Sequence, residues 1–152
     1  MDILSIIFGL KTQAIFDIWS LEHLFSGLSV GSAVKKKSHK EFKKVLNVDD
    51  HSHHSWWFDL TGVMFFAYLW EAIEHYLETG LAGFRVEYWF QGVEFWPNRL
   101  IADPIILMLG YLIAKKYPSL VWPARILSVL WLFFHVFVFP HSMYLQKILF
   151  GL

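Results

Sequence analysis

Cysteine is absent from this chain, which excludes disulfides, thiolate metal ligands and cysteine nucleophiles. An excess of charge is absent too: thirteen Lys and Arg balance thirteen Asp and Glu, and no global field favours nucleic acid as a partner. The start, MDILSIIFGLK, carries an acid where a signal peptide has a base, and no small-residue cleavage site follows, so no cleaved leader is expected. The chain also lacks internal repeats and low-complexity tracts.

Apolar residues are abundant instead. They make up 56% of the 152 residues, and eight tryptophans suit two membrane–water boundaries. Four stretches, residues 14–34, 56–80, 97–114 and 120–139, are long enough, or nearly so, to cross about 30 Å of hydrocarbon. The sequence therefore predicts an all-α integral membrane protein, a single domain of residues 1–152 with four transmembrane helices in one bundle.

Shorter apolar pieces flank these stretches. Short interfacial helices are expected at the N-terminus (residues 2–10), in the loop 81–96 and in the C-terminal segment HSMYLQKILFGL. The loop 81–96 mixes aromatic rings with charged residues, and a lid over a site is the alternative interpretation.

Lysines predict the orientation. The segment KKKSHKEFKK (residues 35–44) and the pair Lys115 and Lys116 lie on one side of such a bundle, which the positive-inside rule makes cytoplasmic. Both termini then face the outer side of the inner (plasma) membrane. The lysine run is also compatible with binding anionic lipid headgroups.

An acidic run interrupts the second stretch. Glu71, Glu74, His75 and Glu78 are spaced i, i+3, i+4 and i+7, within a helical face about 100° wide. Ionisable groups at membrane depth are costly and usually mark a functional site. With the orientation set by the lysines, the outer half of the bilayer also contains a ligand-type side chain from each other helix: His23, Asp103 and His135.

Carboxylates and imidazoles on facing helices are typical ligands of divalent metals. The predicted metal ligands are His23, Glu71, His75 and Asp103, and this donor set suits zinc, manganese and iron alike. Because close carboxylates can share a proton, Glu71 and Glu74 are also predicted to perform acid–base catalysis. The E-x-x-E-H string differs from the E-x-x-H pattern of di-iron proteins. Further site candidates are Glu22, Asn98 and His135.

Structural interpretations compete with these roles. Glu78 reads as a solvated helix-end residue and Asp17 as a boundary residue. Asp103 precedes Pro104, the arrangement of an N-cap followed by a first-turn proline. His135 is equally suited to a hydrogen bond with neighbouring backbone.

Two further local patterns have both a structural and a functional interpretation. Gly27 and Gly31 form a G-x-x-x-G motif, which favours close helix contact. The segment DDHSHHS (residues 49–55) has a metal-binding composition, although acids before a helix also favour its dipole.

The strings LEHLFSGL, LWEAIEHYLE and PNRLIADPIILMLGYLIA resemble a set of small bacterial inner-membrane proteins of unknown function. In that set a histidine–glycine helix precedes a W-E-x-x-E helix and an N-x-x-S-D…G-[FY] helix. The outline, over residues 17–152, is also similar to the VanZ-like family. The resemblance implies these site residues: His23, Gly27, Trp70, Glu71, Glu74, Asn98, Asp103 and Gly110.

This chain departs from that pattern at three places. Ser26 stands where a second histidine is expected, which weakens a metal site centred on His23. The spacing from Asn98 to Asp103 is one residue longer, and the cysteine-rich start of some members is missing. The resemblance implies a site but no settled reaction.

Three functions fit these observations. The first is a metal-dependent or acid–base enzyme that acts on a lipid-type substrate at the bilayer. The second is an accessory or assembly subunit of a membrane complex, in which the polar residues form a structural network. The third is a module that handles protons or cations. A homo-oligomer or a membrane partner is compatible with each of them.

Overall fold

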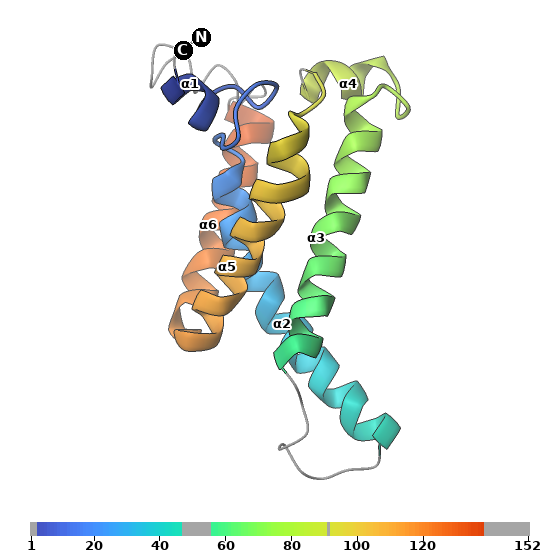
Figure 1. The fold of residues 1–152 in the computed structure, drawn as a ribbon, viewed down its shortest axis with the longest axis vertical. Helices are drawn as coiled ribbons and strands as arrows, with labels where there is room; N and C mark the ends of the chain where they lie inside the picture. The colour runs from blue at the N-terminus through green and yellow to red at the C-terminus, as the bar shows by residue number, and fades with distance from the viewer. Residues whose placement is uncertain (1–2, 47–55, 91, 139–152) are drawn as a thin grey trace.

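The computed structural model describes residues 3–90 and 92–138, apart from the segment 47–55. Within these residues the chain forms α1 (Ile3–Ile7), α2 (Ser20–Leu46), α3 (Trp56–Glu78), α4 (Phe84–Phe90), α5 (Asp103–Lys116) and α6 (Val121–Phe133). A π-helical turn, Asn98–Ala102, leads into α5, and a second one, Phe134–Val138, follows α6; a 3-10 turn, Pro118–Leu120, precedes α6. The four longer helices run along the long axis, with α1 and α4 at one end (Figure 1).

The prediction of four transmembrane helices is wrong. Among the described residues, none of the helices combines the length and the apolar character that a membrane crossing requires. The helices α5 and α6 contain 14 and 13 residues, a rise of roughly 20 Å against about 30 Å of hydrocarbon. The longer α3 carries Asp59 and three glutamates. The predicted inner-membrane location and outward-facing termini depended on these spans and are corrected with them.

The first long helix begins and ends later than predicted. The side chain of Asp17 accepts hydrogen bonds from the backbone N–H groups of Trp19 (2.7 Å) and Ser20 (3.1 Å), which fixes the start of α2. The helix then continues to Leu46 through the lysine-rich segment that was predicted as a loop. Lysine and glutamate favour helix, and Lys37 pairs with Glu41 one turn later (3.6 Å).

Glycines bring α2 and α5 into close contact. A Cβ atom added to Gly27 would lie 2.0 Å from the carbonyl oxygen of Leu107, and one on Gly110 would lie 2.4 Å from that of Leu24. Backbone atoms occupy these positions, so a larger residue requires the helices to separate. This contact, which the G-x-x-x-G spacing predicts, brings His23 near the start of α5.

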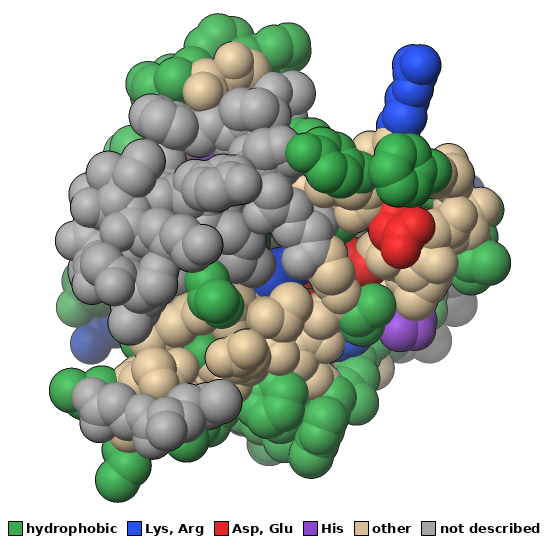
Figure 2. Space-filling view, turned by 90° about the horizontal axis from the view of Figure 1, so that it is seen from above, with side chains coloured by type: hydrophobic (Ala, Val, Ile, Leu, Met, Phe, Trp, Pro, Cys, Tyr) green, Lys and Arg blue, Asp and Glu red, His purple; other side chains and the backbone are tan. Residues whose placement is uncertain are grey.

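Few apolar side chains are buried among the described residues. One cluster joins α2, α3 and α5, and a second joins α2, α5 and α6. Many large apolar side chains are exposed, and hydrophobic atoms are prominent in the view from above (Figure 2). Beneath that end of the molecule lies a group of buried polar side chains.

Candidate metal centre

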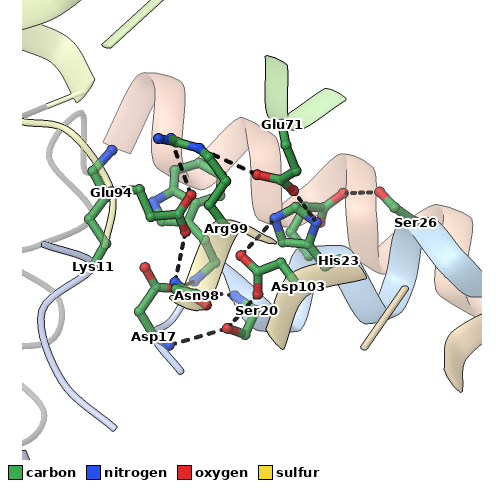
Figure 3. Close-up of polar contacts among 12 residues, drawn as sticks. Lys11, Asp17, Ser20, His23, Ser26, Glu71, Glu94, Asn98, Arg99 and Asp103 are labelled. Carbon is green, nitrogen blue, oxygen red and sulfur yellow. Dashed lines mark hydrogen bonds and ion pairs between the residues drawn. The ribbon is translucent and has the colours of Figure 1, made fainter. Parts of the chain in front are cut away.

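The buried polar group lies where the start of α2, the last turns of α3 and the start of α5 meet (Figures 1 and 3). It contains one histidine, His23, and its carboxyl groups outnumber its cations. Its buried carboxyl residues are Asp17, Glu71, Glu74, Glu78, Glu94 and Asp103, and its buried cations are Lys11 and Arg99. Burial of this many acids requires protons, internal cations or a bound ion.

Four side chains form the part that we call the His23 cluster: His23, Glu71, Glu74 and Asp103. The imidazole lies between two carboxyl groups, with Nδ1 3.6 Å from Glu71 Oε1 and Nε2 3.2 Å from Asp103 Oδ2 (Figure 3). One ligand atom each of His23, Glu71 and Glu74 lies within 4.8 Å of the other two. These three atoms converge closely enough to bind one metal ion.

Glu71 is the most incompletely satisfied member of this cluster. Its side chain is 98% buried, and neither carboxyl oxygen accepts a hydrogen bond from the described residues. Its closest cation is the Nε atom of Arg99, 3.7 Å from Oε2. Burial, reinforced by the charges of Glu74 and Glu94, raises the pKa of Glu71 to about 9. Burial likewise raises the pKa of Glu74 to about 7.

His23 is neutral at physiological pH, because burial lowers its pKa to about 4. A neutral imidazole offers one lone pair to a metal and one N–H to another acceptor. With Nε2 facing Asp103, Nδ1 remains on the side of Glu71. Asp103 is held in turn by the hydroxyl of Ser20, which donates to Oδ1 at 2.9 Å. A carboxyl group hydrogen-bonded to the far nitrogen of a metal-binding histidine usually fixes the orientation of the ring.

Asp103 does not cap α5, contrary to one interpretation of its position before Pro104. The helical backbone already runs through Ala102, and the N–H of Asp103 bonds to the carbonyl oxygen of Asn98, five residues earlier. This π-helical turn accommodates one extra residue in the Asn98–Asp103 spacing. The side chain of Asp103 is fully buried and faces His23, and burial together with the charge of Asp17 raises its pKa.

A second part of the polar group, which we call the ion-paired cluster, contains Lys11, Glu78, Glu94 and Arg99. Glu78 bonds to Lys11 at 2.5 Å and also to Arg99, so both of its oxygens meet a cation. Arg99 lies 3.2 Å from Glu94 as well. This cluster contains two carboxyl groups and two cations, and it is neutral when all four are charged.

Further hydrogen bonds fix the ion-paired cluster. The backbone N–H of Glu94 donates to Glu78 Oε2 (3.0 Å), and the amide of Asn98 donates to Glu94 Oε1 (2.7 Å). Arg99 also contacts Nδ1 of His75 at 3.0 Å. Burial raises the pKa of Glu94, as do the charges of Glu74 and Asp103.

Two groups of side chains have the spacing of metal ligands: His23 with Glu71 and Glu74, and Glu74 with Glu78 and Glu94. In the second group, Lys11 and Arg99 already meet both oxygens of Glu78, and Arg99 also lies beside Glu94. The first group contains the orphaned carboxyl of Glu71 and a neutral imidazole. The first group is therefore the better metal site.

Some predicted site residues lie elsewhere. His75 is exposed and contacts Arg99, because it lies about 100° around α3 from its neighbour Glu74. Glu22 faces α6 and accepts hydrogen bonds from Ser128 and Ser26. His135 lies between the rings of Trp19 and Trp131, at 4.6 and 4.5 Å, and contacts the carbonyl oxygen of Trp131. The three join neither ligand group.

Other interpretations also change. Glu78 and Asp17 are buried, not solvated at a boundary, and Asn98 supports Glu94 instead of contacting His23. The DDHSHHS segment and the predicted C-terminal helix lie outside the described residues. Between α3 and α5, the predicted short helix is present as α4.

Sequence reasoning missed Lys11, Glu94 and Arg99. The signal for Arg99 was its i, i+4 spacing to Asp103, which places both on one helical face. Glu94 has the same spacing to Asn98. Nothing local marks Lys11, because it lies in a loop far from α3 in sequence.

Comparison with protein-family models, curated proteins and solved structures gives no match for this chain, so the resemblance to the VanZ-like family stays a prediction.

Proposed function

We propose that this protein binds one divalent metal ion through His23, Glu71 and Glu74, with Asp103 orienting the histidine. The observation that carries the proposal is the convergence of three buried ligand atoms within 4.8 Å around a carboxyl group that lacks a hydrogen-bond partner. A metal ion supplies the positive charge that this half of the polar group lacks. Zinc, manganese and iron all suit this donor set.

The ligand count supports an acid–base or hydrolytic enzyme as the use of such a metal. Three protein ligands leave a fourth position for water, and a bound divalent ion lowers the pKa of that water toward neutrality. Glu74, with its pKa raised to about 7, is suited to exchange protons near neutral pH when it is not bound to the ion. The expected lipid-type substrate depended on the membrane spans, so the site favours no particular substrate class.

Metal titration tests the proposal. Purified protein, stripped with chelator, is titrated calorimetrically with Zn²⁺ and Mn²⁺ at pH 8. The expected stoichiometry is one ion per chain, and Glu71→Gln is expected to weaken binding by about 100-fold or more, because a neutral amide replaces a ligand charge. Glu22→Gln, at a half-buried acid outside the cluster, is the matched control and is expected to leave affinity within about threefold. Equal weakening by both variants, or no saturable binding, contradicts the proposal.

The ion pairs favour a second candidate, a structural network that fixes how the helices meet, as in an assembly subunit. Lys11 and Arg99 join the N-terminal loop, α3 and the start of α5 through Glu78. Such a network predicts that Glu71→Gln lowers the free energy of unfolding of the metal-free protein. A metal site instead predicts that Glu71→Gln changes the free energy of unfolding of the metal-free protein very little. Glu71 is protonated below its raised pKa, and the amide has nearly the same shape as the protonated carboxyl group.

A further inference from the structure

A separate pocket of about 510 Å³ is lined by α2 and by the last turns of α5, at the opposite end of α5 from Asp103 and the His23 cluster. Its walls combine apolar surface from Tyr111, Ala114 and Pro118 with three lysines. The lysines are Lys35 and Lys36 on α2 and Lys115 on α5. The volume is within the range of small-molecule sites.

The charge of this pocket has one sign. Among the described residues that line it, three are lysines, one is a serine (Ser32) and none is acidic. The hydroxyl group of Tyr111 donates a hydrogen bond to Oδ2 of Asp59 (3.2 Å), which is not among the lining residues. Three cations around an apolar floor attract an anion and offer it several charge-assisted hydrogen bonds.

One of the lysines is held in place by an aromatic ring. The Nζ atom of Lys115 lies 5.4 Å from the centre of the Trp56 ring, a cation–π contact that joins α5 to the start of α3. Other lysines nearby differ: Lys37 pairs with Glu41, and Lys116 lies over the ring of Tyr117; neither lines the pocket. The chain therefore offers matched lysines inside and outside the pocket, on the same two helices.

We propose that this pocket binds a small organic phosphate, with the phosphate group among Lys35, Lys36 and Lys115 and an apolar body against Ala114 and Pro118. Lysine ammonium groups suit phosphate as point charges, and Ser32 supplies a neutral donor. The apolar walls distinguish such a ligand from inorganic phosphate, which would leave them in water. The inference is independent of the metal centre, because no residue is shared.

Phenyl phosphate is the probe that tests this site. Calorimetric titration of the full chain at low ionic strength is expected to show saturable binding, at least about tenfold tighter than that of inorganic phosphate or phenol. The double variant K35Q/K115Q is expected to weaken binding by at least about tenfold. The control K37Q/K116Q removes the same net charge from the same helices and is expected to change affinity by less than about twofold.

Three results would overturn the proposal. The first is no saturable binding of phenyl phosphate, or binding no tighter than that of inorganic phosphate. The second is equal weakening by the pocket and control variants, which would indicate a diffuse charge effect. The third is binding of vesicles with anionic lipid in the absence of phenyl phosphate binding. All four lysines are exposed, and unchanged circular dichroism spectra confirm that the variants retain the fold.

Discussion

The two halves of the buried polar group contain the same kinds of acid in different electrostatic surroundings. In the ion-paired cluster, Glu78 meets Lys11 and Arg99 on its two oxygens. In the His23 cluster, Glu71 meets only a distant edge of Arg99, at 3.7 Å, and a neutral imidazole. Both glutamates are almost completely buried, so burial alone does not separate them.

The difference teaches that a binding site is marked by missing counter-charge and not by acidity itself. Where internal cations match the carboxylates, the network is complete and a bound ion is not needed. Where they do not, the acids hold protons, and a divalent ion competes with those protons for the same oxygens. Each prediction below separates these two situations.

The largest effect is expected from Arg99→Met in the ion-paired cluster. Removing one partner leaves Glu78 and Glu94 with an uncompensated buried charge, which costs about 3–5 kcal/mol of the free energy of unfolding. Urea unfolding at pH 7, in the presence of chelator, measures this loss. Metal affinity of the folded fraction is expected to change less than tenfold, because Arg99 is no ligand.

Arg85→Met is the control for that variant, since Arg85 is exposed on α4. Its expected effect is within about 0.5 kcal/mol. If Arg99→Met were equally mild, the ion pairs would be contributing nothing to the fold, and the contrast between the two clusters would disappear.

The next largest effect is expected from pH. Above about pH 7.5, His23 is neutral both folded and unfolded, whereas folded Glu71 retains, up to about pH 9, a proton that the unfolded chain has lost; Glu74 retains its proton only up to about pH 7. Since the native state then binds more protons, stability of the metal-free protein falls as pH rises. The pH dependence of metal affinity has the opposite sign. The affinity rises with pH, by about tenfold per pH unit for each proton that the metal displaces.

Urea unfolding and metal titration at pH 7.5, 8.0 and 8.5 measure these two slopes. In Glu71→Gln the decline in stability is expected to be shallower, because one of the titrating groups is gone. A metal-free protein whose stability rises over this range would mean that both glutamates are already ionised and paired.

The smallest effect is expected from His75→Gln. The sequence predicts His75 as a metal ligand, whereas the structure places it on the exposed side of Arg99. Loss of one partly exposed contact costs about 1 kcal/mol of stability. Calorimetry is expected to show less than a threefold change in metal affinity. A loss as large as that in Glu71→Gln would restore His75 to the site.

Helical periodicity found the centre of the site. It placed Glu71 and Glu74 on one face of α3, which is the buried face. The meeting of this face with His23 and Asp103 was predicted from their depth in a membrane topology that is wrong, although the side chains do lie together. Periodicity could not choose between His75 and Glu74 as the third ligand, because both flank Glu71 on a helix. That choice depends on how α3 rotates against α2 and α5.

Hydropathy gave the wrong fold class and the wrong helix ends. The apolar stretches suggested membrane spans, but helix ends depend on local contacts such as the Asp17 side chain at the start of α2. The counter-charges were also invisible, because Lys11 reaches Glu78 across 67 residues of sequence. The sequence therefore shows which acids are present and gives no sign of which ones are already neutralised.

Anomalous X-ray diffraction from crystals grown with Zn²⁺ or Mn²⁺ tests the central claim most directly. The account predicts one strong peak at which Nδ1 of His23, Glu71 and Glu74 converge, and none between Glu78 and Glu94. A peak in the ion-paired cluster alone, or no peak at either place in crystals with saturating metal, would contradict it.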